Sequence, residues 1–294
     1  MSVDGGDAVE LETVEENDLV YLEDDEGTWT LDVTAPDSDG PWPLIVVIPP
    51  QFPSGTVAPR LAERGAVVVQ GSAWAPEAAW TSDPNPHLYG VMDRAACIVS
   101  WAQAHAGDYG ADPEVTTIIG YSGGAMAATW VGLGLADDTG CDEPIAHLPV
   151  ALVPGESQFL FHHQRWDPAF ESGDPEPTAT LDCLLNPERW NVSPDLRVGL
   201  WSATNPIAET RPIANPPAAD SWIWLRDAAT PVVDDLAAVG AFDDEAITWH
   251  DNALLMEQRL QSVGIDVRND VYDIGHAYAT PVYDLIFAVQ PDDG

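Results

Sequence analysis

The residues with the clearest potential for chemistry are Gly-Tyr-Ser-Gly-Gly at 120–124. They fit the pattern G-x-S-x-G, which presents a serine hydroxyl on a sharp turn between a strand and a helix. The apolar run 116–121 predicts the strand and 125–133 predicts the helix. Ser122 is therefore the candidate nucleophile, suited to attack on a carbonyl carbon. The structural alternative is a glycine-rich turn with a capping serine.

A serine hydroxyl is a weak nucleophile, so the same site needs a general base. Five of the seven histidines follow the candidate nucleophile, namely His147, His162, His163, His250 and His276. His250 falls within a predicted helix and is expected to be structural. The pair His162-His163 falls in an aromatic, proline-rich stretch. His276 lies between the last predicted strand and the last predicted helix, in a Gly-His loop.

The elements that must position these residues alternate between strands and helices. Strands are expected at 28–36, 43–50, 65–71, 116–121, 145–155, 196–204 and 265–274, and helices at 56–64, 87–107, 125–133, 246–263 and 281–290. This alternation predicts an α/β fold with a doubly wound, mostly parallel sheet and a crevice at the carboxyl ends of its strands. One domain is expected over 21–294 after an acidic lead-in at 1–20, with lid-like insertions at 156–195 and 205–243.

From about residue 19 the chain resembles the α/β-hydrolase superfamily, particularly its esterase/lipase and dienelactone-hydrolase-like branches. The resemblance is carried by TLDVTAP, a turn, PLIVVIPP, AERGAVVVQGSAW, IIGYSGGAMAA and the Gly275-His276 loop, which occur in the order of that family. It implies hydrolysis of a small-molecule carboxylic ester through an acyl-enzyme, without a cofactor or a metal.

The resemblance also implies a chain order of serine, acid and histidine, with the base after the last strand, where His276 lies. The acid is open. Asp244 is favoured because the acidic run at 243–245 immediately precedes a predicted helix, as an acidic turn does in the family. Glu209 is the next candidate, followed by Asp243 and Glu245. Carboxylates before a helix also act as N-caps, which is the structural alternative.

The oxyanion loop departs from the family pattern. The family usually has His-Gly after the strand at 44–48, whereas this chain has Pro-Pro-Gln-Phe-Pro at 49–53. An oxyanion hole needs backbone N–H donors, and proline has none. We therefore expect Gln51 to donate together with Gly123, the residue after the nucleophile. Side chains bordering the pocket are expected from Tyr121, Phe52 and Trp74.

The charge of the chain is extreme, with 49 acidic and 10 basic residues and a net charge of −39. All the basic residues are arginines, and the acidic ones are spread from Asp4 to Asp293. This composition resembles that of proteins from halophilic archaea, since at molar salt the Debye length is about 3 Å and self-repulsion is screened. A nucleic-acid partner is not expected, because phosphate contacts need a basic patch.

No membrane segment is expected, because the apolar stretches at 44–50 and 66–69 are far shorter than the ~18 residues that a spanning helix needs. The acidic N-terminal stretch has no features of a secretory signal, so a cytoplasmic location is expected. Cys97, Cys141 and Cys183 match no metal motif and do not suggest a disulfide framework. We interpret Cys97 as a buried residue of an apolar helix.

Two other functions remain open from the residues alone. One is a non-catalytic protein of the hydrolase fold that binds a ligand or partner, because a fold does not determine a function. The other is a lactone or carbon–carbon hydrolase that uses the same triad.

Overall fold

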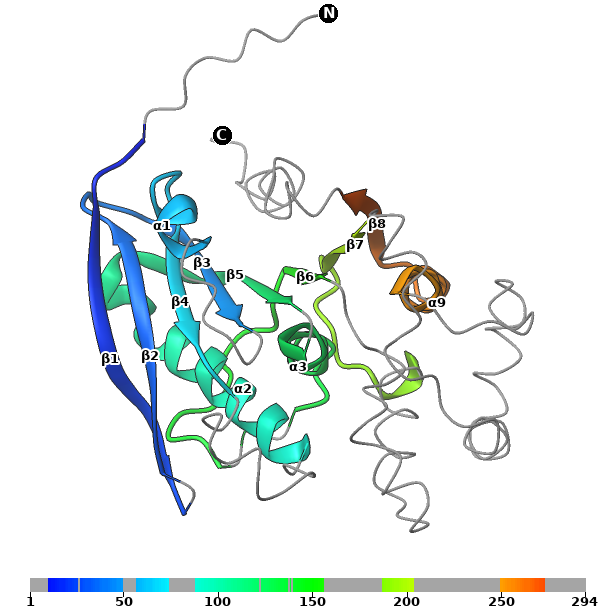
Figure 1. The fold of residues 1–294 in the computed structure, drawn as a ribbon, viewed down its shortest axis with the longest axis horizontal. Coiled ribbons are helices and arrows are strands. Elements are labelled where there is room, and N and C mark those ends of the chain that lie inside the picture. The colour runs from blue at the N-terminus through cyan, green and yellow to red at the C-terminus, as the bar shows by residue number, and fades with distance from the viewer. Residues whose placement is uncertain are drawn as a thin grey trace, which may run out of the picture.

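The computed structural model describes residues 10–25, 27–49, 57–73, 88–121, 123–136, 138, 140–155, 187–203 and 249–272. They contain one eight-stranded sheet with the order β1-β2-β4-β3-β5-β6-β7-β8 (Figure 1). The strands are β1 (Thr13–Asp24), β2 (Gly27–Pro36), β3 (Trp42–Ile48), β4 (Val67–Gly71), β5 (Ala111–Tyr121), β6 (Ala151–Gly155), β7 (Arg197–Ala203) and β8 (Asp266–Tyr272). The helix that the sequence predicts at 281–290 lies outside the described residues.

The sheet is mostly parallel, as the sequence predicts. β2 pairs antiparallel with both β1 and β4, and every pairing from β4 through β3, β5, β6 and β7 to β8 is parallel. Parallel neighbours require crossover connections, which helices supply. The carboxyl ends of these parallel strands therefore lie along one edge of the sheet.

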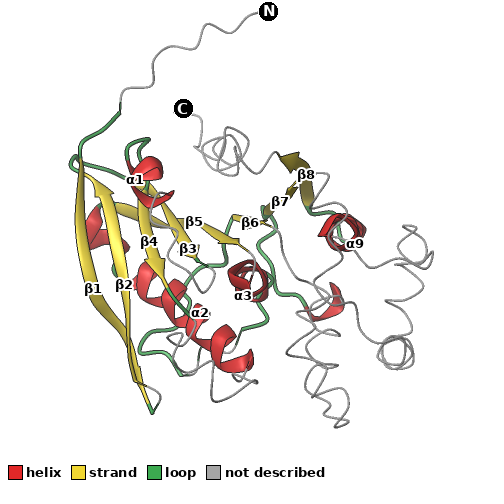
Figure 2. Ribbon diagram, viewed as in Figure 1, coloured by secondary structure: helices red, strands yellow, loops and turns green. Residues whose placement is uncertain are grey.

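Helices cover both faces of the sheet (Figure 2). The described helices are α1 (Val57–Ala62), α2 (Leu88–Ala104), α3 (Gly123–Gly132) and α9 (Trp249–Ser262), with short 3-10 turns at Ala106–Tyr109 and Pro187–Arg189. Residues of α1 belong to a small core cluster on one face, and residues of α2, α3 and α9 belong to a larger cluster on the other. This arrangement is the doubly wound architecture.

The central strand β3 shows why both faces must be covered. Leu44, Val46 and Ile48 contribute to the cluster with α2 and α3, whereas Ile45 and Val47 contribute to the cluster with α1. Each of these side chains is at most 4% exposed. Burying one such side chain contributes about 1.5–3 kcal/mol. A continuous apolar run is thus the signature of a strand covered on both faces.

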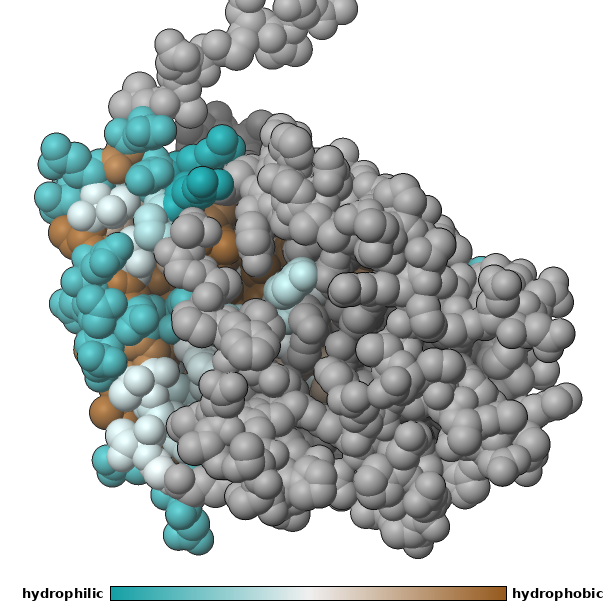
Figure 3. Space-filling view, in the orientation of Figure 1, coloured by the Kyte–Doolittle hydropathy of each residue, from teal (hydrophilic) through white to brown (hydrophobic). Residues whose placement is uncertain are grey.

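The acidic lead-in expected at 1–20 is wrong in part, because β1 already begins at Thr13. Most of β1 is exposed, and among its residues Tyr21 alone is buried. Acidic side chains on the exposed positions hide the alternation that would reveal a strand. Figure 3 shows mainly hydrophilic residues on the described surface beside β1 and β2. Such charges protect a sheet edge from pairing with another chain.

The strand expected at 145–155 is confined to Ala151–Gly155. The preceding segment is bound to α2 instead. The Gln103 side chain accepts hydrogen bonds from the N–H groups of Ala146 (3.0 Å) and His147 (3.1 Å) and donates one to the carbonyl of His147 (2.8 Å). Backbone groups that would otherwise extend the strand are therefore satisfied by a side chain of the helix.

A disulfide between Cys97 and Cys141 corrects the expectation that the cysteines form none. It links α2 to the connection between α3 and β6, across 44 residues of sequence. Cys97 is buried in its helix, as expected, but it is not a lone thiol. An odd number of scattered cysteines hides this pair, because its partners are brought together only when the connection packs on α2.

Of the two expected insertions, the described part of the first comprises residues 187–195, with a 3-10 turn at Pro187–Arg189. The second, at 205–243, lies outside the described residues. Among the helices that the structure describes, none has the length and apolar character needed to cross a membrane.

Candidate active site

The carboxyl ends of the parallel strands are level with one another. Ile48 at the end of β3 pairs with Gly120 of β5, and Tyr121 at the end of β5 pairs with Gly155 at the end of β6. Gly155 pairs in turn with Trp201 of β7, which pairs with Asp270 of β8. The row from β5 to β8 thus runs straight across the sheet. Side chains that follow these strand ends are brought to a common edge.

The turn at 120–124 is a sharp strand-to-helix connection. β5 ends at Tyr121 and α3 begins at Gly123. A Cβ atom on Gly120 would lie 2.6 Å from Ala125 Cα and 2.7 Å from Ala128 Cβ. The first turns of α3 therefore pack directly on the end of β5, and only glycine permits that approach.

Gly124 brings α3 against the neighbouring strand. A Cβ atom on this residue would collide with the carbonyl oxygen of Ile48 and would lie 2.7 Å from the carbonyl oxygen of Pro49. The chain leaving β3 therefore touches the first turn of α3. That chain leads into 49–53, the loop from which an oxyanion donor is expected. Sequence reasoning explains a glycine here by local crowding, but the contact with β3 becomes visible only in the fold.

The first turn of α3 has the electrostatic character that an oxyanion site needs. The first N–H groups of a helix have no partner within the helix, and the helix dipole places partial positive charge at that end. Gly123 is the first residue of α3, and the first turn contains no acidic side chain. A developing negative charge near this turn would be stabilised.

Tyr121, expected at the pocket, is partly buried and packs against the core cluster on the α1 face. The other expected site residues lie outside the described residues: Ser122, His276, Asp244, Glu209, Asp243, Glu245, Gln51, Phe52 and Trp74. The described elements nonetheless end next to several of them. β8 ends at Tyr272, which pairs with Ala203 of β7, so the chain that continues to His276 starts at the carboxyl edge.

In the described ranges, no group of three or more histidine, cysteine, aspartate or glutamate side chains is arranged to hold a metal ion. Sequence reasoning overlooked a buried arginine, Arg94 of α2, which contacts the chain just beyond β4. The only signal for it in the sequence is a basic residue within a largely apolar helical segment.

No family model and no curated protein matches this sequence. Solved structures do match its fold. A thermophilic esterase from the planctomycete Thermogutta terrifontis, with propionate bound, aligns with a TM-score of 0.55 and 12% identity over 92% of this chain and 85% of that chain. The same organism's esterase 2 phosphorylated by paraoxon aligns with a TM-score of 0.56 and 13% identity over 88% and 82%. Esterase Est22 aligns with a TM-score of 0.51 and 16% identity over 90% and 72%.

The chain has the α/β-hydrolase fold. At these identities the likeness is one of architecture, and it confirms the fold class predicted from the order of strands and helices. In an α/β-hydrolase fold, the G-x-S-x-G turn stands at the carboxyl edge of the sheet. The described ends of β5 and α3 flank that turn here.

Proposed function

We propose that this protein is a serine hydrolase that cleaves small-molecule carboxylic esters through an acyl-enzyme. The observation that carries the proposal is the close-packed turn from β5 to α3, in which Gly120 and Gly124 admit no side chain and Ser122 is the residue between the two elements. Solved structures of the same fold are described as esterases, which supports ester hydrolysis as the reaction.

In the proposed reaction, the Ser122 hydroxyl attacks the acyl carbon while His276 accepts its proton. The oxygen of the tetrahedral intermediate is stabilised by the N–H groups of Gln51 and Gly123. His276 then returns the proton to the departing alcohol, and an acyl-enzyme remains. Water, activated by the same histidine, releases the acid and restores the serine.

The packing of Gly124 supports the proposed oxyanion hole. The chain leaving β3 touches the first turn of α3 at Gly124, the residue after Gly123, so the loop at 49–53 starts next to that turn. Pro49 and Pro50 cannot donate, which leaves Gln51 as the proposed second donor. Removing one such donor from a hydrolase costs about 10²–10³ in kcat.

The proposed acid is Asp244, with Glu209, Asp243 and Glu245 as alternatives. α9 connects the carboxyl end of β7 to the amino end of parallel β8. A crossover helix of this kind begins on the side of the carboxyl edge. The acidic run at 243–245 shortly precedes α9, which supports an acid from this run near the base. Its role is to hold the imidazole tautomer, and its loss lowers kcat by about 10⁴ in a related triad.

The proposal is tested with a short-chain nitrophenyl ester and a fluorophosphonate probe, both in multimolar KCl so that the acidic chain stays folded. We expect the probe to label Ser122, and Ser122→Ala to lower kcat by at least about 10³-fold. Ser262→Ala is the matched control, since Ser262 is an exposed serine at the end of α9. Equal labelling and turnover in Ser122→Ala would refute a serine mechanism.

The acid is tested separately. Asp244→Asn preserves the shape of the side chain and removes its charge, so kcat should fall with little change in stability. Glu209→Gln, Asp243→Asn and Glu245→Gln serve as comparisons in the same assay. Near-normal turnover in Asp244→Asn, with a large loss in one of the others, would move the assignment to that residue and leave the serine mechanism intact.

A further inference from the structure

Arg94 is the one charged side chain among the described buried residues, with 5% of it exposed. A cation inside a protein must be compensated by partners. Its Nε donates to the carbonyl oxygen of Ala73 at 2.9 Å, and its Nη1 lies 3.8 Å from Oδ2 of Asp24. Its guanidinium carbon lies 4.2 Å from the centroid of the Trp29 ring, which is a cation–π contact. The arginine is thus held from three sides.

Two of these partners, Asp24 and Trp29, come from the end of the β1–β2 hairpin. Oδ1 of Asp24 accepts hydrogen bonds from Nε1 of Trp29 and from the N–H of Gly27, both at 3.0 Å. The carboxylate that neutralises Arg94 is therefore fixed by its own hairpin. Because the same aspartate orients the indole ring, the ion pair and the cation–π contact form one unit.

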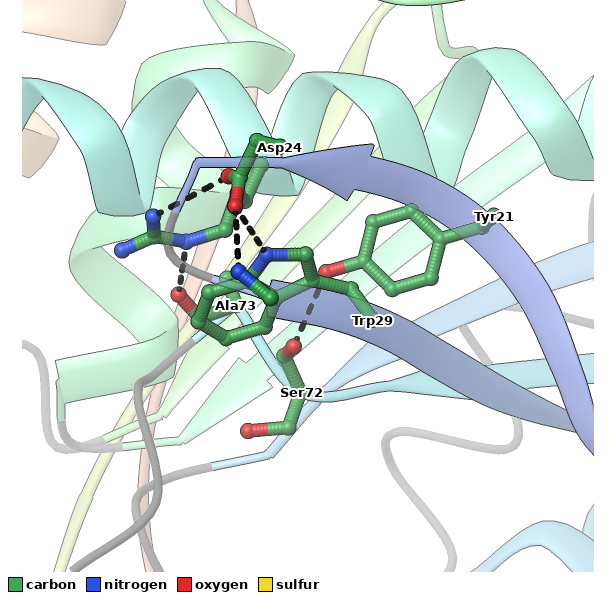
Figure 4. A network of polar contacts seen from close by, with 7 residues as sticks. Tyr21, Asp24, Trp29, Ser72 and Ala73 are labelled. Carbon is green, nitrogen blue, oxygen red and sulfur yellow. Dashed lines mark hydrogen bonds and ion pairs between the residues drawn. The ribbon is translucent and has the colours of Figure 1, made fainter.

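Tyr21 of β1 binds Ser72, the residue before Ala73, whose carbonyl oxygen Arg94 binds. Its hydroxyl donates to the carbonyl oxygen of Ser72 at 3.0 Å. The Tyr21 side chain is buried, and that burial raises the pKa of its hydroxyl well above the usual range, so the group remains a donor. Two consecutive carbonyl groups, at Ser72 and Ala73, are therefore bound by side chains from other elements (Figure 4).

These carbonyl groups lie at the edge of the candidate active site. Gln70 of β4 pairs with Val47 of β3, which pairs with Ile119 of β5. Ser72 and Tyr121 each lie two residues beyond this row, at the same carboxyl edge. Only β3 separates their strands, and neighbouring strands lie about 4.8 Å apart. The two strands are thus about 10 Å apart, within the reach of a bound ester.

We propose that Arg94 and Tyr21 are positioning residues that fix the chain leaving β4 as one wall of the substrate site. The inference rests on the proposed ester hydrolysis and adds a determinant of substrate binding to it. Neither side chain touches the reacting atoms. Their effect reaches the substrate through the backbone at Ser72 and Ala73, so it acts on KM more than on kcat, because a displaced wall weakens binding before it disturbs the nucleophile.

Tyr21→Phe is the decisive variant, since it removes the hydroxyl and keeps the buried ring. Tyr109→Phe is its matched control, because the Tyr109 hydroxyl also binds β1, at Glu16 (2.8 Å), but it lies next to the amino end of β5. With a nitrophenyl ester in high KCl, we expect Tyr21→Phe to raise KM about three- to tenfold with kcat nearly unchanged. Tyr109→Phe should leave both constants unchanged.

Arg94 is tested by a pair of variants. Arg94→Met removes the charge and the donor, and Arg94→Lys keeps a cation that can still donate to the Ala73 carbonyl. We expect the KM of Arg94→Lys to lie between those of the wild type and Arg94→Met. A KM for Arg94→Lys equal to that of Arg94→Met would contradict a role for the carbonyl contact.

Hydrogen exchange at 71–73 gives a second readout that does not depend on turnover. It should be about tenfold faster in Tyr21→Phe than in Tyr109→Phe, because one anchoring hydrogen bond is lost. If the wild type hydrolyses esters and Tyr21→Phe changes KM no more than Tyr109→Phe, the positioning role is overturned and the proposed function stands. If the wild type hydrolyses no ester, the proposed function fails, and with it the role in substrate binding. In that case, equal exchange rates at 71–73 in Tyr21→Phe and Tyr109→Phe would also show that the Tyr21 hydroxyl does not fix the chain leaving β4.

Discussion

At the scale of single residues, Gly124 is a position two residues after the candidate nucleophile where the fold leaves no room for a side chain. A Cβ atom there would meet two carbonyl oxygens of the backbone, those of Ile48 and Pro49, which cannot rotate away. We expect Gly124→Ala to lower the free energy of unfolding by about 2–4 kcal/mol and to reduce kcat, because α3 must move away from β3. Chemical denaturation in high salt measures the first effect and ester turnover the second.

Gly107 supplies the control for that substitution. A Cβ atom on Gly107 would meet nothing within 4 Å, so Gly107→Ala should change stability by no more than about 0.5 kcal/mol. Equal stability of the two variants would show that the contact of Gly124 with the chain leaving β3 is looser than the structure has it.

Residues that act through local sequence could be predicted, and residues that act across the fold could not. The turn at 120–124 was recognisable because its glycines and its flanking strand and helix are contiguous. The hydrogen bonds of Tyr21 and Arg94 to the chain beyond β4 were not recognisable. Tyr21, Ser72 and Arg94 are distant in sequence and meet only when the β1–β2 hairpin packs on α2. No spacing rule connects such positions.

At the scale of elements, the described strands that run continuously apolar were the easiest to predict. All residues of β3 except Trp42 are buried, and so are Val67, Val68 and Val69 of β4, which form short continuous apolar runs. No strand was predicted at β1, because most of its side chains are exposed and many are acidic. The strand predicted at 145–155 is longer than the observed β6, because the side chain of Gln103 in α2 binds the backbone that precedes β6. Both differences arise from tertiary packing, which the local secondary-structure propensity of the sequence does not reflect.

The connection between α3 and β6 depends on the bond from Cys97 to Cys141. With a sequence separation of 44 between the cysteines, the loop-entropy model assigns the bond a stabilisation of about 4 kcal/mol. We expect the double variant Cys97→Ser, Cys141→Ser to lose most of this free energy of unfolding. Denaturation with and without a thiol reductant measures it. Reductant should destabilise the wild type and leave the double variant unchanged, and equal stability of wild type and variant would show that the bond does not form.

The same bond bears on where the protein resides. Disulfides persist mainly in oxidising compartments and are rare in a reducing cytosol. The bond therefore weighs against the cytoplasmic location expected from the N-terminal sequence. The composition-based expectation considered each cysteine separately, whereas Cys97 and Cys141 become partners only through the packing of α2 against a distant connection.

At the scale of the whole molecule, the alternation of strands and helices was sufficient to predict the doubly wound sheet. The strand order β2-β4-β3-β5 does not follow from that alternation, because the right-handedness of parallel crossovers fixes the face on which each helix lies and not the neighbour of each strand. The acidic surplus is a property of the surface. Among the described residues, no aspartate or glutamate is buried, and Arg94 is the one buried charge.

The net charge of −39 predicts a strong dependence of stability on salt. At 0.1 M salt the Debye length is about 10 Å, so neighbouring surface carboxylates repel one another, whereas at 1 M it is about 3 Å and most of that repulsion is screened. The unfolded chain spreads the same charge over a larger volume, so low salt favours unfolding. We expect the thermal midpoint, followed by tryptophan fluorescence, to rise steadily from 0.1 to about 3 M KCl.

Screening must be separated from the general strengthening of apolar burial by co-solutes. Sucrose strengthens apolar burial but does not screen charge. At 0.1 M KCl it should therefore raise the thermal midpoint only in part, and not to the value reached in about 3 M KCl. Sodium chloride should act as potassium chloride does, because screening depends on ionic strength. If sucrose raised the thermal midpoint as much as the salts do, weak hydrophobic burial and not charge repulsion would be the cause of the low stability at 0.1 M KCl. Because most carboxylates of the described residues are exposed, the salts should instead have the larger effect, and ester turnover should recover over the same range of ionic strength as the folded state.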